Sequence, residues 1–397
     1  MGMDNVLLIN SEYTMVPYGI THVKICINRN FRHVISNLPL SVTHVTFDDN
    51  YNQPTDYLPN NIISVVFGKK YNQLTNNLPN SITSLTFGEK YNQPTNNLPP
   101  NITHLTFGGN YDQPINNFPS SITHLTFGTY YNQPTDHLPP NITHLTFGTY
   151  YNQPTDHLPP NITHLTFGRN YDQATDHLPP NITHLVFGAY YNQPADHLPP
   201  NITYLAFGAY YNQPADHLPP NITYLAFGSD YNQPMNNPIG YSYHYNQPTN
   251  NLPNNIKSII FGDFYNQPTD NLPHSIISVT FGRDYNQPTN NLPSNITHLA
   301  FGYYYNQPTN NLPDNITHLT FGNNYNQSIN DLPSSITHLI VSDRYGQPVT
   351  FKDNYNLIYT NSKLCSIAYH ANKNRHNLWV KSCSLLDVLY PVVDFKY

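Results

Sequence analysis

A unit of 20 residues recurs along most of the chain and limits what the chain can fold into. The copy that starts at Tyr151 and ends at Asn170 reads YNQPTDHLPPNITHLTFGRN. Regular copies open with the tyrosines Tyr51, Tyr71, Tyr91, Tyr111, Tyr131, Tyr151, Tyr171, Tyr191, Tyr211, Tyr245, Tyr265, Tyr285, Tyr305 and Tyr325. A fixed period of this length is typical of solenoids, in which each repeat packs only on its neighbours. The 397 residues therefore predict one long stack of coils rather than two or three globular domains.

One segment of each repeat has the composition of a β-strand. In the central copy it runs from Ile142 to Phe147 and is rich in β-branched and aromatic residues. Ile142, Leu145 and Phe147 are predicted to face the core, together with the leucine before each Pro-Pro pair and the opening tyrosine. Gly148 ends the strand, which predicts a turn where a side chain or a negative φ would be unfavourable.

The rest of the repeat is predicted to return without a helix. Residues 150–157 contain a proline and lack helical periodicity, and Pro159 and Pro160 favour an extended backbone. A single unit buries too few side chains to offset the entropy of ordering 20 residues, so stability must come from stacked neighbours. We therefore predict an all-β fold, a parallel β-solenoid of leucine-rich-repeat type with about 20 residues per coil and little or no helix in the repeats.

The pattern LPxxIxxLxFGxxYNQP resembles the FNIP repeat family, whose members occur chiefly in slime moulds and giant amoeba-infecting viruses. The residues that carry the resemblance are Leu158, Pro159, Ile162, Leu165, Phe167, Gly168, Tyr171, Gln173 and their counterparts in other copies. The resemblance covers residues 31–348 and implies a repeat similar to a leucine-rich repeat. The copies depart from the bacterial leucine-rich repeat where that repeat has an internal asparagine ladder.

The breaks in the repeat predict three regions. Residues 1–30 are expected to form an N-terminal cap with a first half-repeat, residues 31–348 the FNIP-type solenoid, and residues 349–397 a C-terminal cap. Within the solenoid, Tyr231 and Tyr245 are 14 residues apart instead of 20. A shortened coil is therefore expected at 231–244, with Ile239 and Tyr241 as its strand anchors.

Composition and motifs argue against several classes of function. The chain has 16 Lys and Arg against 23 Asp and Glu, a net charge of −7, which disfavours a nucleic-acid-binding surface. Three cysteines without framework spacing suit a reducing compartment, and neither a signal peptide nor a membrane-spanning stretch is evident. We expect an intracellular, cytoplasmic monomer that does not bind membranes. No phosphate loop, Cys-x-x-Cys pair or serine elbow occurs, so we expect neither an enzyme nor a cofactor.

The candidate functional site is one position of the strand, which is predicted to face outward on the concave side of the solenoid. Its residues are His104, His124, His144, His164, His184, Tyr204, Tyr224, His298, His318 and His338. Neighbouring strands lie about 4.8 Å apart, so these side chains should form a column. Such a column could be a solvated face copied by duplication, a protein-binding face, or a set of metal ligands. The last reading has least support, because no acidic or cysteine partner occurs at ligand spacing.

Neighbouring histidines in such a column should resist full protonation. Two imidazolium ions about 4.8 Å apart repel by roughly 0.9 kcal/mol in water. This repulsion predicts lowered histidine pKa values and a stability that falls as the pH drops through the histidine range.

The sequence thus predicts a non-catalytic protein–protein interaction scaffold that presents its concave strand face to a protein partner. The resemblance to a partly viral family makes a host protein a candidate for that partner. The alternative is a structural or filler protein, such as a virion or matrix component, without a specific partner.

Overall fold

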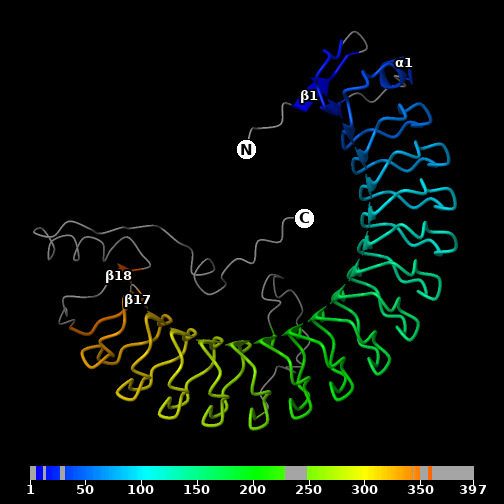
Figure 1. The fold of residues 1–397 in the computed structure, drawn as a ribbon. Coiled ribbons are helices and arrows are strands. Elements are labelled where there is room, and N and C mark those ends of the chain that lie inside the picture. The colour runs from blue at the N-terminus through cyan, green and yellow to red at the C-terminus, as the bar shows by residue number, and fades with distance from the viewer. Residues whose placement is uncertain are drawn as a thin grey trace, which may run out of the picture. The chain divides into compact units, whose positions relative to one another are not determined.

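The computed structural model describes residues 6–11, 15–26, 32–228, 248–342, 344–348 and 356–359. The chain divides into two units, Met1–Gln193 and Pro194–Tyr397, which we describe separately. In both units the regular elements are short parallel β-strands, one for each coil (Figure 1). The predicted parallel β-solenoid of leucine-rich-repeat type is therefore confirmed.

Unit 1 contains ten strands and one short helix among its described residues. Neighbouring strands pair in parallel in chain order, from β1 to β10. They lie along one side of the unit and the returning loops along the other (Figure 1). The elements are β1 (Val6–Ile9), β2 (His22–Ile25), α1 (Arg32–Ser36), β3 (His44–Phe47), β4 (Ser64–Val66), β5 (Ser84–Thr86), β6 (His104–Thr106), β7 (His124–Thr126), β8 (His144–Thr146), β9 (His164–Thr166) and β10 (His184–Val186). The helix α1 lies in the divergent repeat that follows residue 30, so this first coil departs from the helix-free pattern of the later ones.

Unit 2 continues the same design with strands of three or four residues. Its elements are β11 (Tyr204–Ala206), β12 (Tyr224–Ala226), β13 (Ser258–Ile260), β14 (Ser278–Thr280), β15 (His298–Ala300), β16 (His318–Thr320), β17 (His338–Val341) and β18 (Asn356–Tyr359). β12 pairs directly with β13, Tyr224 opposite Ser258, so the sheet continues without a strand from the predicted shortened coil. That coil, with Ile239 and Tyr241, lies outside the described residues.

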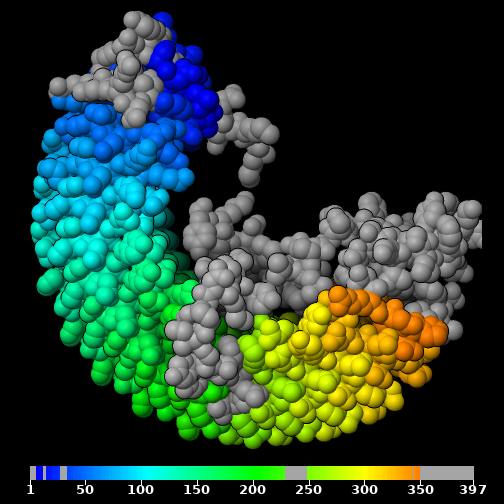
Figure 2. Space-filling model, turned by 180° about the vertical axis from the view of Figure 1, so that it is seen from behind, coloured from blue at the N-terminus to red at the C-terminus, as the bar shows by residue number. Residues whose placement is uncertain are grey.

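The predicted strand and tyrosine core positions are confirmed, and the leucine before Pro-Pro is buried in most copies but only partly buried at Leu138. In the central copy Ile142, Leu145 and Phe147 are 0–2% exposed, and Tyr151 is 0% exposed. The Phe147 and Tyr151 rings stack with centroids 3.8 Å apart, and Phe147 also stacks on Phe167 of the next coil at 5.7 Å. The space-filling view shows neighbouring coils of unit 1 packed directly against one another (Figure 2). Each coil is thus stabilised by aromatic contacts inside itself and with its neighbours.

Two polar ladders join successive coils. The buried tyrosine of one coil bonds to a buried threonine of the preceding coil, as between Thr155 Oγ1 and the Tyr171 hydroxyl at 2.9 Å. Near the surface, the Asn152 Oδ1 accepts from the backbone N–H of Asp172 at 3.0 Å and from Gln173 Nε2 at 3.1 Å. An asparagine ladder therefore exists, but it lies one residue after the opening tyrosine rather than at the leucine-rich-repeat position.

The glycine that follows each strand is explained by close approach of two backbones. A Cβ on Gly148 would fall far inside contact distance of the Gly128 carbonyl oxygen, and Gly128 stands in the same relation to Gly108. Among the described glycines only Gly19 and Gly228 have positive φ. The prediction that Gly148 avoids a side chain is confirmed, whereas the suggestion that a negative φ would be unfavourable there is wrong.

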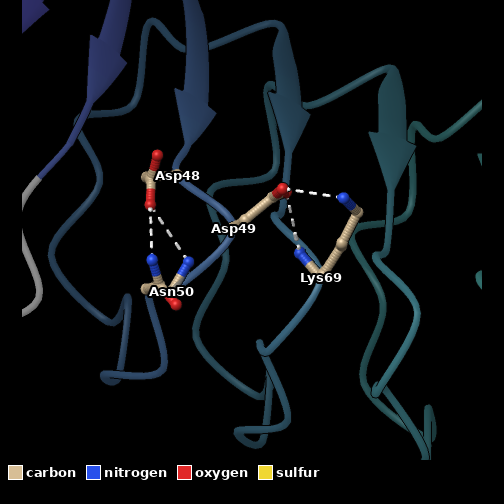
Figure 3. Close-up of polar contacts among 4 residues, drawn as sticks. All are labelled: Asp48, Asp49, Asn50 and Lys69. Carbon is tan, nitrogen blue, oxygen red and sulfur yellow. Dashed lines mark hydrogen bonds and ion pairs between the residues drawn. The ribbon is translucent and has the colours of Figure 1, made fainter.

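The first coil of this glycine series tolerates a side chain. Asp48 stands at the glycine position, and its Oδ1 accepts from the backbone N–H of Asn50 at 3.1 Å (Figure 3). Beside it, Asp49 Oδ2 forms an exposed ion pair with Lys69 Nζ at 3.0 Å (Figure 3). Such surface pairs contribute little to stability, so the stack depends on its core and ladders.

Candidate functional site

The strand register of unit 1 places five predicted site residues in one continuous column. His104, His124, His144, His164 and His184 are direct partners on successive strands β6 to β10. Their imidazole rings stack with centroids 4.2 Å apart at each step and interplanar angles of 11–14°. We call these five residues the histidine column. Its prediction as a close stack on adjacent strands is confirmed by this geometry.

The site residues of unit 2 form two shorter groups along the same position. Tyr204 and Tyr224 stack at 4.3 Å, and His298, His318 and His338 stack at 4.4 and 4.2 Å. The serines of β13 and β14, at positions 258 and 278, separate the two groups in the register. The sequence position is therefore continuous through these strands, but its aromatic rings are not.

A threonine next to each histidine fixes the orientation of the ring. Thr143 Oγ1 lies 2.9 Å from His144 Nδ1 and 3.2 Å from the Thr123 carbonyl oxygen. The same pair of bonds recurs at Thr103, Thr123, Thr163 and Thr183. The Thr123 carbonyl oxygen also accepts from the backbone N–H groups of Thr143 and His144, at 2.9 and 3.0 Å. The threonine hydroxyl has one hydrogen, so it either donates to this carbonyl and accepts from Nδ1–H, or donates to Nδ1. In both cases the bond holds the imidazole ring beside the threonine.

Burial disfavours the charged form of four histidines in the column, His124, His144, His164 and His184. Burial lowers the pKa of His124 and of His164 to about 4, and the positive charges of neighbouring histidines act in the same direction. The pKa values of His144 and His184 are lowered by burial as well. In unit 2, burial lowers the pKa of His298 and His318. The predicted direction is confirmed, but its leading cause is burial and not repulsion between imidazolium ions.

A second histidine series lies on the opposite part of the coil. His137, His157 and His177 in unit 1 precede the Leu-Pro segment and are exposed.

In the described part of the chain, no group of three or more His, Cys, Asp or Glu side chains surrounds a point where a metal could sit. Repetition also places like side chains in parallel, whereas acid–base catalysis needs unlike groups that converge on one point.

Sequence reasoning missed the role of the threonines, although the dipeptide Thr-His recurs with every histidine of the column. A row of exposed tyrosines lies along one edge of unit 1. Tyr130 and Tyr150 are 53% and 46% exposed and stack at 5.2 Å, and the Arg169 guanidinium lies 5.3 Å from the Tyr190 ring centroid. Adjacent tyrosines such as Tyr130 and Tyr131 predict stacked rings with one ring of each pair turned inward, and the buried Tyr131 and Tyr151 and the stacked Tyr130 and Tyr150 confirm this.

Comparison with known protein families shows to which family the chain belongs. The model of the FNIP Repeat matches most of the repeat region. The matched residues are 31–70, 55–90, 91–130, 115–150, 131–170, 151–177, 174–210, 211–239, 245–284, 285–324 and 305–340. The chain belongs to the FNIP repeat family. The geometry described above is thus that of FNIP repeats, with coils like those of leucine-rich repeats.

A solved structure with a similar fold is CroV588, described as a novel circular LRR protein. It is 35% identical to this FNIP-repeat chain, with a TM-score of 0.67 over 90% of this chain and 60% of CroV588. The chain thus spans about 60% of the length of CroV588. YopM from Yersinia enterocolitica WA-314 is 18% identical, with a TM-score of 0.49 over 81% of this chain and 67% of YopM. The search of curated proteins found no match.

The described residues include no helix with the length and apolar composition needed to cross a lipid bilayer. The longest helix among them, α1, has five residues.

Proposed function

We propose that the chain is a non-catalytic scaffold that binds a partner protein on the strand face that carries the histidine column. The observation that carries the proposal is the column itself, five side chains of one kind held in register on adjacent strands. Core packing does not explain why the same residue type recurs in successive coils, because these side chains point away from Leu145 and its buried counterparts.

The column has properties that suit recognition. Its rings are held by stacking and by the threonine bonds, so little side-chain entropy is lost when a partner binds. A column of threonines on the same strands, including Thr126 and Thr146, adds hydroxyl groups beside the imidazole rings. Solenoids commonly bind proteins through the strand face, which supports the same assignment for Tyr204, Tyr224 and the histidines of unit 2.

The absence of an enzyme motif in the sequence supports a non-catalytic role, and the cysteine spacing supports an intracellular location. The proposed partner is a protein, with a host protein as the first candidate, and the proposed state of the free chain is a monomer. Nothing in the proposal requires nucleic acid or a membrane.

Affinity capture from host-cell extract tests this proposal with matched variants. The strand variant carries His124→Ser, His144→Ser and His164→Ser, because serine already stands at this position in β4 and β5. The loop variant carries His137→Asn, His157→Asn and His177→Asn, because asparagine stands at the equivalent positions 77, 97 and 117.

A partner retained by the wild type and the loop variant but lost from the strand variant supports the proposal. A partner retained equally by all three contradicts the assignment of the face. Self-assembly of the chain without any specific partner would instead indicate the structural role that the sequence left open.

A further inference from the structure

We propose that one edge of unit 1 determines which partner the chain binds, and that it fits an extended acidic segment of a protein that also carries aromatic side chains. The edge consists of the two residues between the glycine position after each strand and the opening tyrosine of the next copy. We call it the variable edge, and its residues are 49–50, 69–70, 89–90, 109–110, 129–130, 149–150, 169–170 and 189–190. The inference rests on the scaffold role proposed above for the class of partner, a protein, and concerns a different surface from the histidine column.

The backbone of the variable edge is the same in each of these coils. The N–H of its second residue donates to the carbonyl oxygen of the first residue in the preceding coil, as from Lys90 to Lys69 at 2.8 Å and from Tyr150 to Thr129 at 2.9 Å. The bond recurs at every step between residues 49 and 190. Asp49 and Lys69 lie just beyond the ends of two neighbouring strands (Figure 3). The backbone is thus fixed from coil to coil, and only the side chains differ.

The side chains of the variable edge change along the stack, unlike those of the histidine column. In chain order the coils carry Asp-Asn, Lys-Lys, Glu-Lys, Gly-Asn, Thr-Tyr, Thr-Tyr, Arg-Asn and Ala-Tyr. Exposure alone does not produce this range, because the exposed position of Asp156 holds only Asp or Asn at 56, 76, 96, 116, 136 and 176. A row of identical histidines fits a partner equally well in several registers, whereas side chains that differ in each coil select one register and one partner.

Positive charge is concentrated on the variable edge. Between residues 37 and 193 every lysine and arginine lies there, namely Lys69, Lys70, Lys90 and Arg169. Lys69 Nζ pairs with Asp49 at 3.0 Å and Lys90 Nζ with Glu89 at 3.8 Å, whereas the Lys70 ammonium group forms no ion pair with the described residues. The whole chain has a net charge of −7, so this edge is where an acidic segment is attracted to unit 1 rather than repelled.

Tyrosine and arginine side chains follow the lysines along the edge. Tyr130, Tyr150 and Tyr190 are 53%, 46% and 37% exposed, and the Tyr130 and Tyr150 rings stack with centroids 5.2 Å apart. The Arg169 guanidinium lies 5.3 Å from the Tyr190 ring centroid and donates from Nη2 to the Tyr190 hydroxyl at 3.5 Å. Tyrosine and arginine are enriched among the residues that contribute most to protein–protein binding. This part of the edge therefore suits aromatic side chains and a carboxylate of the same partner segment.

The spacing of the coils sets the length of the partner segment. From Lys69 to Tyr190 the edge passes through seven copies of the repeat. Six steps of about 4.8 Å span about 29 Å, which an extended segment covers with about nine residues at about 3.3 Å per residue. The proposed partner segment is therefore short enough to bind without a fold of its own.

Fluorescence anisotropy of the full chain with synthetic peptides tests the proposal. The probe is a fluorescein-labelled peptide of about nine residues in which Glu and Phe alternate. One reference peptide replaces every Glu by Gln, and the other replaces every Phe by Ala. We expect the Glu-Phe peptide to bind more tightly than either reference, and its affinity to fall as the salt concentration rises.

Two variants remove the side chains that the proposal requires. The lysine variant carries Lys69→Asn, Lys70→Asn and Lys90→Asn, and the tyrosine variant carries Tyr130→Asn and Tyr150→Asn. Asparagine already stands on the edge at positions 50, 110 and 170, so both variants keep a residue that this backbone accepts. Each should weaken binding of the Glu-Phe peptide by about tenfold.

A charge control separates the edge from the net charge of the chain. It carries Asn76→Asp, Asn96→Asp and Asn116→Asp, because aspartate stands at the equivalent positions 136, 156 and 176. Its net charge changes by as much as that of the lysine variant, and the affinity for the peptide should fall by less than about threefold.

The strand variant with serine at positions 124, 144 and 164 keeps the variable edge and should bind the peptide as the wild type does. Circular dichroism and thermal melts confirm that each variant is folded. No preference for the Glu-Phe peptide over the reference peptides, or an equal loss of affinity in the charge control or the strand variant, overturns the proposal. These measurements use no host-cell extract, so their failure is distinct from a failure of the capture experiment.

Discussion

A threonine hydroxyl group holds the ring of each residue in the histidine column. Thr143 is only partly buried and contributes little to the core, yet its hydroxyl bridges the preceding coil and the His144 ring. The ring is thereby held in one orientation, stacked between His124 and His164.

The tyrosine–threonine ladder shows what happens when one hydroxyl is missing. Tyr131 is 0% exposed and its hydroxyl has no hydrogen-bond partner among the described residues. The reason is that Ile115 occupies the threonine position of the preceding copy. A buried polar group without a partner costs about 1–3 kcal/mol.

Removing the Tyr131 hydroxyl should therefore not destabilise the protein. We predict that Tyr131→Phe leaves the free energy of unfolding unchanged or raises it by about 1 kcal/mol, since it removes an unpaired buried group. The matched change Tyr171→Phe should lower it by about 1–3 kcal/mol, because it leaves the buried Thr155 hydroxyl without its 2.9 Å partner. Urea unfolding of both variants measures the difference, and equal losses at the two positions would contradict the ladder.

At the scale of the coil, the glycine after each strand sets how closely neighbouring coils can approach. We predict that Gly148→Ala lowers the free energy of unfolding by about 3 kcal/mol, because its Cβ would collide with the backbone of Gly128. The control Gly109→Ala should change it by less than about 0.5 kcal/mol, because the nearest atom to that Cβ is Glu89 Cγ at 3.5 Å. A small effect at both positions, measured by chemical unfolding, would show that the coils are farther apart than described.

The regular features of the coil could be predicted from the sequence because they depend on local pattern. Alternation placed Leu145 and Phe147 in the core and His144 on the surface, and the period of 20 residues put each copy of His144 on the next strand. Contacts between coils were harder to predict. The bond from Thr155 to Tyr171 and the clash that excludes a side chain at Gly148 both depend on which backbone atoms the next coil brings near.

The candidate site could be predicted only in part for the same reason. The sequence located the histidines but not the bond that orients their rings, because Thr143 is equally consistent with an ordinary strand residue. It also attributed the lowered pKa values to repulsion alone. Burial proved to be the larger cause for His124 and His164, and burial depends on ring stacking that a spacing argument does not reveal.

At the scale of the whole molecule, the lowered histidine pKa values couple folding to pH. The unfolded chain binds protons at these histidines near pH 6.5, whereas the folded chain holds His124 and His164 neutral down to about pH 4. Between these values the unfolded state binds more protons, so stability is complete above about pH 6.5 and falls as the pH decreases.

We therefore predict that the midpoint of urea unfolding decreases between pH 7.5 and pH 5. The variant His124→Ser with His164→Ser should show a shallower decrease, because two groups with lowered pKa values are gone. A midpoint independent of pH, or equal slopes in the wild type and the variant, would contradict this coupling.

The most direct test of the account is the protonation of the column itself, because the column carries the proposed interaction face. Long-range 1H–15N correlation spectra of the histidine-labelled chain follow each imidazole through a pH titration, and single His→Ser variants assign the signals. The account predicts titration midpoints near pH 4 for His124 and His164. Midpoints near pH 6.5 at both positions would contradict it.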